Sequence, residues 1–341
     1  MKIKKILSAL VITTVLTTSL SGCNENANSN PWGFPSSDSA QESSSSTMSS
    51  SSEESSSSKT ESSSSKSEST SSEPESSSSE PESSSSETES SSSEPESSEP
   101  EIIRETPAHD FDYVYIEEIG GIEITKYRGY DNKINIPATI EDKPVTGIGF
   151  EAFNNRPEIK RIIIPEGVVE IGYYAFAGCS GLTEIVIPDS VIDIDHHAFT
   201  DCKSLKDVTI GSGVNKIGEK AFVGCSSIAS LVIPDNVTEI GNNAFGGCSG
   251  IRSLTIGKGL SEISKYLFYE CDGLTIVTIP NNIIRIGEAA FAWCDRLKKV
   301  MIPTGIAEVN KSAFSNCPNI EITFKDRTYS HDHLNDFYAA I

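Results

Sequence analysis

The sequence predicts an α/β solenoid of stacked 23-residue coils, each made of a strand, a turn and a short helical segment, and preceded by a disordered linker. Two recurrences predict this fold, because a fixed period of 20 to 50 residues indicates a repeat architecture. A phenylalanine returns every 23 residues, at Phe153, Phe176, Phe199, Phe222, Phe245, Phe268, Phe291 and Phe314. A cysteine keeps the same period, at Cys179, Cys202, Cys225, Cys248, Cys271, Cys294 and Cys317, and Arg156 holds its place in the first copy.

Within each repeat, the apolar pattern predicts one strand followed by a turn. Ile185 and Ile187 alternate with other residues, and this period of two in branched side chains indicates a strand that Pro188 closes. A second apolar pair, Val191 and Ile194, leads to the Ala-Phe segment, which is long enough for one or two helical turns. A parallel β-helix is the main rival fold, but its coils are mostly strand.

The recurring cysteine admits three interpretations. A buried cysteine packs as a small apolar filler. Disulfide-linked rungs would need Cα atoms within about 7 Å, which neighbouring helical segments usually exceed, and seven cysteines cannot all pair. A metal site lacks support, because the sequence has no CxxC pair and no histidine grouped with the cysteines. We favour the packing interpretation and expect neither disulfide nor metal.

The first 22 residues have the organisation of an export signal. Three lysines precede an apolar and hydroxyl stretch, Ile6 to Leu20, which is short for a membrane-spanning helix. The residues Leu20 to Cys23 resemble the lipobox of bacterial lipoproteins, which implies cleavage before Cys23 and lipid attachment to its sulfur. The alternative is an ordinary signal peptide with a chance cysteine. We expect a membrane anchor through lipid at Cys23, without a spanning segment.

Residues 23–104 are expected to form a lipidated N-terminus and a disordered linker. From Ser36 to Pro100, 37 of 65 residues are serine, and most of the others are glutamate, proline and threonine. Such a composition cannot bury enough apolar surface to offset the conformational entropy lost on folding. A coil of this length has a root-mean-square reach of roughly 50 Å and would act as a tether.

The charge distribution argues against a nucleic-acid partner. Residues 1–101 contain 5 lysines and 17 acidic residues, a net charge of −12, and the remainder carries −10 of the total of −22. Neither part offers the basic surface that binding to nucleic acid requires.

Aligned copies share the phrase IPxxVxxIGxxAFxxCxxLxxIxIP, seen at 187–210 with Asp195 in place of the glycine. This phrase resembles the BspA-type leucine-rich repeat of bacterial surface proteins, also described from treponemes. The resemblance covers about 148–324 and implies a right-handed leucine-rich-repeat stack in an adhesive or protein-binding surface protein. Residues 105–147 resemble the N-terminal hairpin and partial coil that open such domains. The period is lost over 325–341, where we expect a C-terminal cap that ends in a short helix.

No catalytic site or cofactor is predicted. His196 and His197 occupy positions that are polar in other coils, which marks them as solvent positions. His331 and His333 could share a metal with Asp332, but polar terminal segments are usually only solvated. We therefore expect a protein that is not an enzyme.

A binding surface is the more credible site, because a curved solenoid sheet leaves the outward strand residues of its concave face free to vary. Ordinary β-propensity on an exposed sheet accounts for the same residue types equally well. The candidate positions are Arg161, Ile163, Glu184, Val186, Asp207, Thr209, Ser230, Val232, Ser253, Thr255, Ile276, Thr278, Lys299 and Met301.

Trp293 is a second candidate, since most other coils place glycine or an acidic residue there. Together with Tyr266 and Tyr269 of the preceding coil it would form an aromatic patch for sugar or protein, with chance surface aromatics as the alternative. The sequence therefore predicts an anchored surface protein that binds a protein ligand on a host, a neighbouring cell or the matrix. The alternatives are a module that holds polysaccharide or a secreted enzyme at the surface, and a plain structural spacer.

Overall fold

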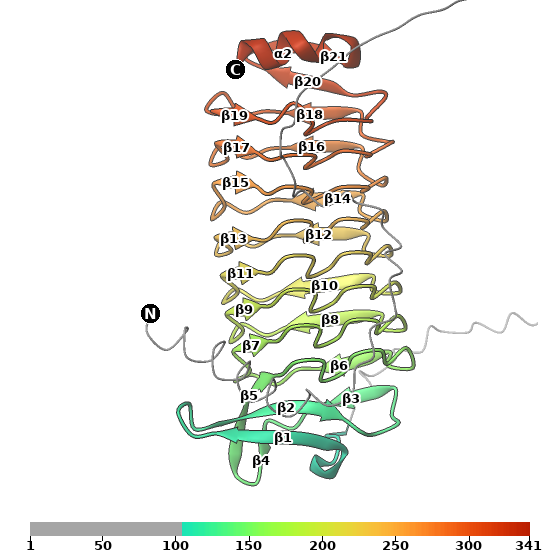
Figure 1. The fold of residues 1–341 in the computed structure, drawn as a ribbon, viewed down its shortest axis with the longest axis vertical. Coiled ribbons are helices and arrows are strands. Elements are labelled where there is room, and N and C mark those ends of the chain that lie inside the picture. Colours follow the sequence, from blue (N-terminus) through green and yellow to red (C-terminus); the bar gives the residue numbers. More distant parts are fainter. Residues whose placement is uncertain (1–103) are drawn as a thin grey trace, which may run out of the picture. The chain divides into compact units, whose positions relative to one another are not determined.

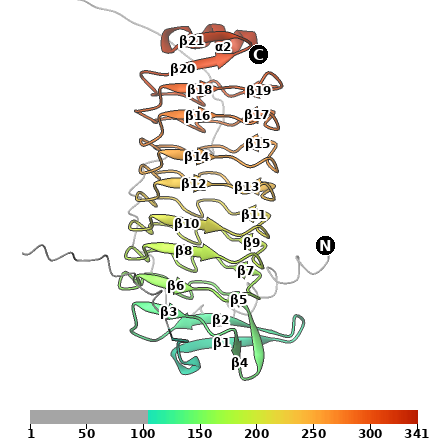
Figure 2. The same ribbon diagram turned by 180° about the vertical axis from the view of Figure 1, so that it is seen from behind.

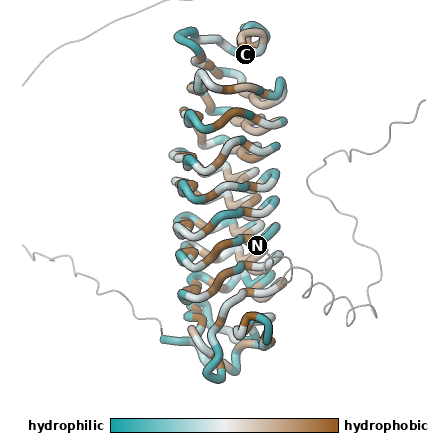
Figure 3. Tube along the Cα trace, turned by 90° about the vertical axis from the view of Figure 1, so that its left-hand side faces the viewer, coloured by the Kyte–Doolittle hydropathy of each residue, from teal (hydrophilic) through white to brown (hydrophobic). Residues whose placement is uncertain are grey.

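A computed structural model describes residues 104–341 of the chain. The expected signal peptide, Cys23 and the serine-rich linker lie outside the described residues. The described part is a stack of coils that follow one another along the chain, as Figure 1 shows. Figures 1 and 2, together with the perpendicular view in Figure 3, show the coils rising along a nearly straight axis, so the expected concave face is close to flat.

One side of the stack, the long-strand face, is built from the first strand of each coil. Neighbouring strands pair in parallel at equivalent repeat positions within three runs, β3 to β10, β12 to β14 and β16 to β20; Ile162 pairs with Ile185 and Val277 with Val300. The strands are β3 (Lys133–Asn135), β6 (Arg161–Ile163), β8 (Glu184–Ile187), β10 (Asp207–Ile210), β12 (Ser230–Val232), β14 (Ser253–Thr255), β16 (Ile276–Thr278), β18 (Lys299–Met301) and β20 (Glu321–Phe324).

A second side, the short-strand face, comes from strands that the sequence reading did not separate from the turn. They are also parallel and in register, as Ile171 and Ile194 illustrate. These strands are β5 (Lys143–Ile148), β7 (Glu170–Ile171), β9 (Asp193–Ile194), β11 (Lys216–Ile217), β13 (Glu239–Ile240), β15 (Glu262–Ile263), β17 (Arg285–Ile286) and β19 (Glu308–Val309). Figure 3 shows hydrophilic and hydrophobic segments alternating along the coils seen from this side.

The third side, the turn face, corrects one expectation: the Ala-Phe segment is a run of turns and contains no helix. Its N–H groups alternate between two kinds of acceptor. Phe176 donates to the oxygen of Ala198 in the next coil at 2.8 Å, whereas Ala177 donates to Tyr174 within its own coil at 3.1 Å. Positive φ at Tyr174 (57°) and Gly178 (72°) breaks the right-handed path that a helix needs. About half of the N–H groups that a helix would use within the segment therefore donate to the next coil of the stack instead.

The phenylalanines form the predicted continuous column in the core. All eight are at most 1% exposed. Rings of successive coils stack with centroids 4.9 to 6.0 Å apart and interplanar angles of 6 to 21°. Each coil thus buries its apolar edge only against the next one, which is why a single repeat cannot be stable alone.

The N-terminal end is closed by the predicted hairpin and partial coil. A 3-10 helix, η1 (Ala108–Asp110), leads into β1 (Phe111–Ile116), which pairs antiparallel with β2 (Gly121–Tyr127). A small hairpin, β4 (Thr139–Ile140) with β5, follows. Tyr127 stacks on Phe153 at 5.6 Å and extends the aromatic column by one ring.

The C-terminal end is covered by β21 (Arg327–Ser330), η2 (His331–His333) and the predicted terminal helix, α2 (Leu334–Ala340). Phe337 of α2 is fully buried, with its ring 5.9 Å from Phe324 and 5.7 Å from Tyr329. None of the helices within residues 104–341 is long and apolar enough to span a membrane.

Candidate functional site

The outward side chains of the long-strand face lie in two parallel columns. The first column contains Arg161, Glu184 and Asp207, and it includes an ion pair between Arg161 and Glu184 at 2.7 Å. It continues through Ser230, Ser253, Ile276 and Lys299. All of the predicted outward residues are at least partly exposed.

The second column carries no charge along its whole length. Val186 is 61% exposed and Val232 is 55% exposed, and Thr209 of the intervening coil separates them. Methyl groups and hydroxyls therefore form a mildly apolar strip across the stack, flanked by the charges of the first column. The members are Ile163, Val186, Thr209, Val232, Thr255, Thr278, Met301 and Thr323.

The three residues of the predicted aromatic patch, Trp293, Tyr266 and Tyr269, lie in turns of the turn face. Trp293 is 48% exposed and has a left-handed backbone, with φ of 60°. Tyr266 and Tyr269 pack edge to face at 5.8 Å, and the Tyr266 hydroxyl donates to Glu288 Oε1 at 2.9 Å. This bond raises the pKa of Tyr266.

The histidines differ in exposure, and His196 and His197 are less exposed than the predicted solvent positions would be. His331 and His333 are exposed, and His333 Nδ1 lies 2.9 Å from Ser330 Oγ. His196 and His197 are partly buried, and burial lowers the pKa of His197, with Lys220 adding to this effect. Across residues 104–341, no group of three or more His, Cys, Asp or Glu side chains has the arrangement of a metal site.

The seven repeat cysteines are free and fully buried, as the packing interpretation predicts. The structure adds a polar role that the sequence reading missed. Cys179 Sγ lies 3.1 Å from the carbonyl oxygen of Phe153 in the preceding coil, and each later cysteine repeats this contact at 3.1 to 3.3 Å. Burial raises the pKa of Cys179 to about 12, so this thiol stays protonated and can donate.

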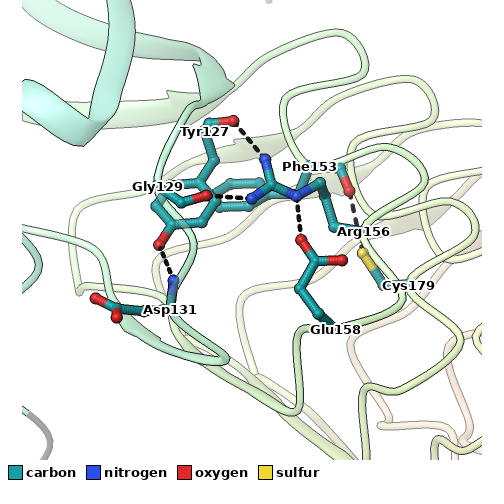
Figure 4. A network of polar contacts seen from close by, with 7 residues as sticks. All are labelled: Tyr127, Gly129, Asp131, Phe153, Arg156, Glu158 and Cys179. Carbon is teal, nitrogen blue, oxygen red and sulfur yellow. Dashed lines mark hydrogen bonds and ion pairs between the residues drawn. The ribbon is translucent and has the colours of Figure 1, made fainter.

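Arg156, at the first position of this column of cysteines, also donates hydrogen bonds to backbone carbonyls of the preceding coil. Figure 4 shows its guanidinium reaching the backbone of the capping coil, where Nη1 donates to the oxygen of Tyr127 at 2.8 Å and Nη2 donates to Gly129. The guanidinium also lies over the Tyr127 ring, 4.9 Å from its centroid, and pairs with Glu158. The break in the cysteine pattern at Arg156 was the signal for this role.

The short-strand face carries a column of charged side chains, interrupted once by Gly147, that the sequence reading did not identify. Both of its cations stand beside acids: Lys216 lies 3.8 Å from Asp193, and Arg285 lies between Glu262 at 3.2 Å and Glu308 at 3.0 Å. In register order the column reads Glu123, Gly147, Glu170, Asp193, Lys216 and Glu239, then Glu262, Arg285 and Glu308.

At its N-terminal end this column contains acids without a cation beside them. Burial raises the pKa of Glu123. Burial also raises the pKa of Glu170 to about 7, with further contributions from Asp193, Asp195 and Glu123, against a smaller lowering by Lys216. Near neutral pH, Glu170 is therefore only partly ionised.

A row of exposed rings follows this acidic end three residues further along each coil. Phe150 and Tyr173 are 42% and 37% exposed and stack at 5.9 Å with 6° between the ring planes. Tyr173 lies edge to face with Tyr174 at 4.3 Å and 6.4 Å from the ring of His196. Burial raises the pKa of Tyr173 to about 12, with Tyr174, Asp195 and Glu219 adding to the effect. These residues are the functional candidates that sequence reasoning missed.

The turn face of the first coils also holds an open hollow of about 610 Å³. Its lining is mostly polar, with one aromatic ring, that of Tyr174. It combines carboxylates, amides, hydroxyls and a lysine from three successive coils: Glu151, Asn154, Asn155, Ser180, Thr200, Asp201 and Lys203.

Comparison with known proteins identifies the repeats. A family model described as BspA type leucine rich repeat region matches residues 125–245 and 215–333, with 6 copies. A crystal structure of a T. pallidum leucine rich repeat protein has 33% sequence identity and a TM-score of 0.55, covering 57% of this chain and 91% of that chain. A leucine-rich repeat protein from Bacteroides ovatus has 25% identity and a TM-score of 0.46, covering 66% and 71%. A search of curated proteins found no match.

Proposed function

The chain belongs to the BspA-type leucine-rich repeat family of bacterial surface proteins, and from this premise we propose that it is a non-enzymatic, lipid-anchored adhesin whose long-strand face binds another protein. Leucine-rich repeat proteins generally bind proteins, and the repeat fold is typically non-catalytic. The partner would be a protein on a host, a neighbouring cell or the extracellular matrix.

The observation that supports this function is the uncharged strip from Ile163 to Thr323. A rigid row of methyl and hydroxyl groups about eight coils long offers apolar contact at low entropic cost, because parallel strands hold every side chain in place. The charged neighbours Arg161, Glu184 and Lys299 supply the polar rim that protein interfaces usually have. Both features follow from the 23-residue register.

The test compares binding to panels of purified surface and matrix proteins. In the triple variant Val186→Glu/Val232→Glu/Thr255→Glu, three carboxylates would interrupt the strip, and we expect binding to a cognate protein to fall at least about tenfold, as hot-spot losses do. The matched control places three glutamates at Ser212, Ser226 and Thr304, which are exposed and lie outside the strip. Equal capture by the wild type and the strip variant would remove this proposal.

Anchoring through Cys23 is a separate part of the proposal, since this residue lies outside the described residues. The order of lysines, apolar stretch and lipobox supports it. Metabolic labelling with a fatty acid tests it: we expect label on the wild type and none on Cys23→Ser, which should leave the membrane fraction. Label on the Cys23→Ser variant would contradict it.

Polysaccharide binding is the second candidate function, and the hollow beside Tyr174 favours it. Carboxylates, amides and hydroxyls around one aromatic ring match the polar and apolar faces of a sugar. Calorimetric titration with cell-wall and matrix polysaccharides tests this, with Asp201→Ala expected to abolish any binding in the hollow. Binding that survives Asp201→Ala and Tyr174→Ala together would place the sugar elsewhere.

A further inference from the structure

The N-terminal end of the charged column on the short-strand face differs from the rest. Lys216 and Arg285 each stand next to an acid of a neighbouring coil. Glu123 and Glu170, by contrast, are separated only by Gly147, which contributes no side chain. Gly147 therefore occupies the register position between these two acids, where a lysine or arginine would place a cation.

The carboxylate of Glu123 points into that place. A side chain at Gly149 would collide with Glu123 Oε1, and a Cβ at Gly147 would lie 3.9 Å from Oε2, so the carboxylate lies over β5 on the way to β7. Glu123 is only 9% exposed, and it has no hydrogen bond or ion pair with any residue in the described range 104–341. A buried carboxylate without a partner is costly unless something binds it.

Two exposed rings, Phe150 and Tyr173, come three residues after the column positions of Gly147 and Glu170. Phe150 follows Gly149 directly, and its exposed ring stacks on Tyr173. Asp195 lies beside these rings, because its Oδ1 accepts a hydrogen bond from the His196 N–H at 2.7 Å and the His196 ring lies 6.4 Å from Tyr173. Carboxylates beside exposed π faces form the arrangement that attracts an ammonium or guanidinium group.

We propose that Glu123, Glu170, Asp195, Phe150 and Tyr173, the acid–aromatic surface, form a docking site for a lysine or arginine side chain presented by a protein partner. This surface lies on the short-strand face and does not depend on the uncharged strip of the long-strand face. The two sites can therefore be tested separately.

Charge identifies the occupant as a basic segment of another protein. The serine-rich tract of this chain is unsuitable, because residues 1–101 carry a net charge of −12 and would be repelled. A second copy of the repeat region is also net negative, at −10. A partner with clustered lysines or arginines instead gains from both the carboxylates and the rings.

The experiment titrates the full-length chain with tetralysine amide by calorimetry, using a tetrapeptide of N-acetyl-lysine as the uncharged probe of equal length. We expect saturable binding of tetralysine and none of the acetylated peptide. Glu123→Gln/Glu170→Gln should weaken tetralysine binding at least about fivefold, the range of one exposed cation–π contact and one charge-assisted bond. The matched control variant Glu262→Gln/Glu308→Gln removes two carboxylates at a place where Arg285 already supplies a cation. It should weaken tetralysine binding less than twofold.

The aromatic contribution has its own pair of variants. Tyr173→Ala should weaken binding about threefold or more, whereas Tyr173→Phe keeps the ring and should bind as the wild type does. Equal losses in the two double-glutamine variants would mean general charge attraction, including that of the serine-rich tract, and would overturn the proposal. An unchanged affinity in Tyr173→Ala would also overturn it as stated.

Proton release provides a readout that a purely structural role would not change. The charged groups around Glu170 are Glu123 from β2, Asp193 of β9, Asp195 after it and Lys216 of β11, while β5 presents only Gly147. A cation at this site favours the ionised form of Glu170, so binding at pH 7 should release protons in the wild type and none from Glu170→Gln, as measured in buffers of different ionisation enthalpy. Binding should be tighter at pH 8 than at pH 5.5. Stronger binding at the lower pH would contradict the site.

Discussion

Arg156 donates to the backbone oxygen of Tyr127 at 2.8 Å between Nη1 and O, and this contact starts a column that cysteine thiols continue through seven coils. Tyr127 occupies the ring position that phenylalanine holds in later coils, and its oxygen corresponds to that of Phe153. The longer arginine side chain reaches two carbonyls of the irregular capping coil at once, which a thiol could not do. The repeat domain and its N-terminal cap are therefore joined by one guanidinium.

Replacing this guanidinium should uncouple the cap. Arg156→Ala leaves the carbonyls of Tyr127 and Gly129 without a donor, and we expect the free energy of unfolding to fall by about 2 to 3 kcal/mol, the range for bonds that involve a charged donor. Arg252→Ala, a change at an exposed arginine, serves as control and should cost less than about 0.5 kcal/mol. Urea unfolding measures both, and similar losses in the two variants would argue against the cap function.

The repeat thiols should resist alkylation in the folded protein. Burial raises the pKa of Cys179 to about 12 and that of Cys317 to about 11, so well under 1% of either thiol is ionised at pH 8. In a Cys23→Ser background, we expect iodoacetamide to label the native chain only as fast as it opens, with Cys317 first, and all seven cysteines rapidly in urea. Peptide mass spectrometry measures the order. Rapid labelling of Cys248 in the folded chain would contradict its burial.

The aromatic column should be least tolerant of truncation in its centre. Phe222 is fully buried between Phe199 at 4.9 Å and Phe245 at 5.3 Å, so Phe222→Ala leaves a cavity that two neighbouring coils share. We expect a loss of about 3 to 5 kcal/mol in unfolding free energy. Phe150→Ala removes the same atoms from a ring that is 42% exposed and should cost about 1 kcal/mol or less. Chemical denaturation of both variants provides the comparison.

Glu170 should make the protein less stable as pH rises. Burial, followed by Asp193, Asp195 and Glu123, raises the pKa of Glu170 from 4.5 to about 7 in the folded state. Between these values the folded chain holds a proton that the unfolded chain has released, so stability falls from about pH 5 to pH 8. Glu170→Gln should remove this decline and be more stable than the wild type at pH 8, by about 1 to 3 kcal/mol. Thermal unfolding across this pH range measures it, and parallel curves for the two proteins would contradict the shift.

Gly147→Lys should place the missing cation in the column. A Cβ at Gly147 would meet no atom closer than 3.4 Å, so the side chain has room beside Glu123 and Glu170. We expect a gain of about 0.5 to 1 kcal/mol at pH 8 that shrinks at pH 5, where Glu170 is mostly protonated. The same variant should lose tetralysine binding, because its own ammonium occupies the site. Gly147→Ala is the control for the backbone change, and an equal gain in that variant would assign the effect to the backbone.

Much of the repeat region could be predicted from the pattern alone. The spacing from Phe153 to Phe314 predicts the aromatic column, and the alternation at Ile185 and Ile187 predicts the first strand of each coil. The predicted helix was wrong because local propensity carries no information about hydrogen bonds between coils, and about half of the N–H groups of this segment donate to the next coil. Glycine at Gly178, Gly224 and Gly247, where φ is positive, was the local signal of a left-handed turn.

The acid–aromatic surface could not be predicted, for a different reason. Its residues Glu170 and Tyr173 follow the period, but Glu123 lies in the capping hairpin, where the chain departs from the repeat. The shift in register between Ile122 and Glu123 decides that this carboxylate stands opposite Gly147. No spacing in the sequence encodes that pairing.

The amino-acid sequence alone thus determined which side chains recur on each coil, because an apolar edge repeated every 23 residues can be buried only by stacking on its own copies. Only the tertiary structure decided how the irregular cap joins the first coil, and hence which charges are left without partners. Pairing between segments that share no period depends on bulges and hydrogen bonds that form when the coils meet, and these bonds placed Arg156 on Tyr127 and Glu123 over Gly147.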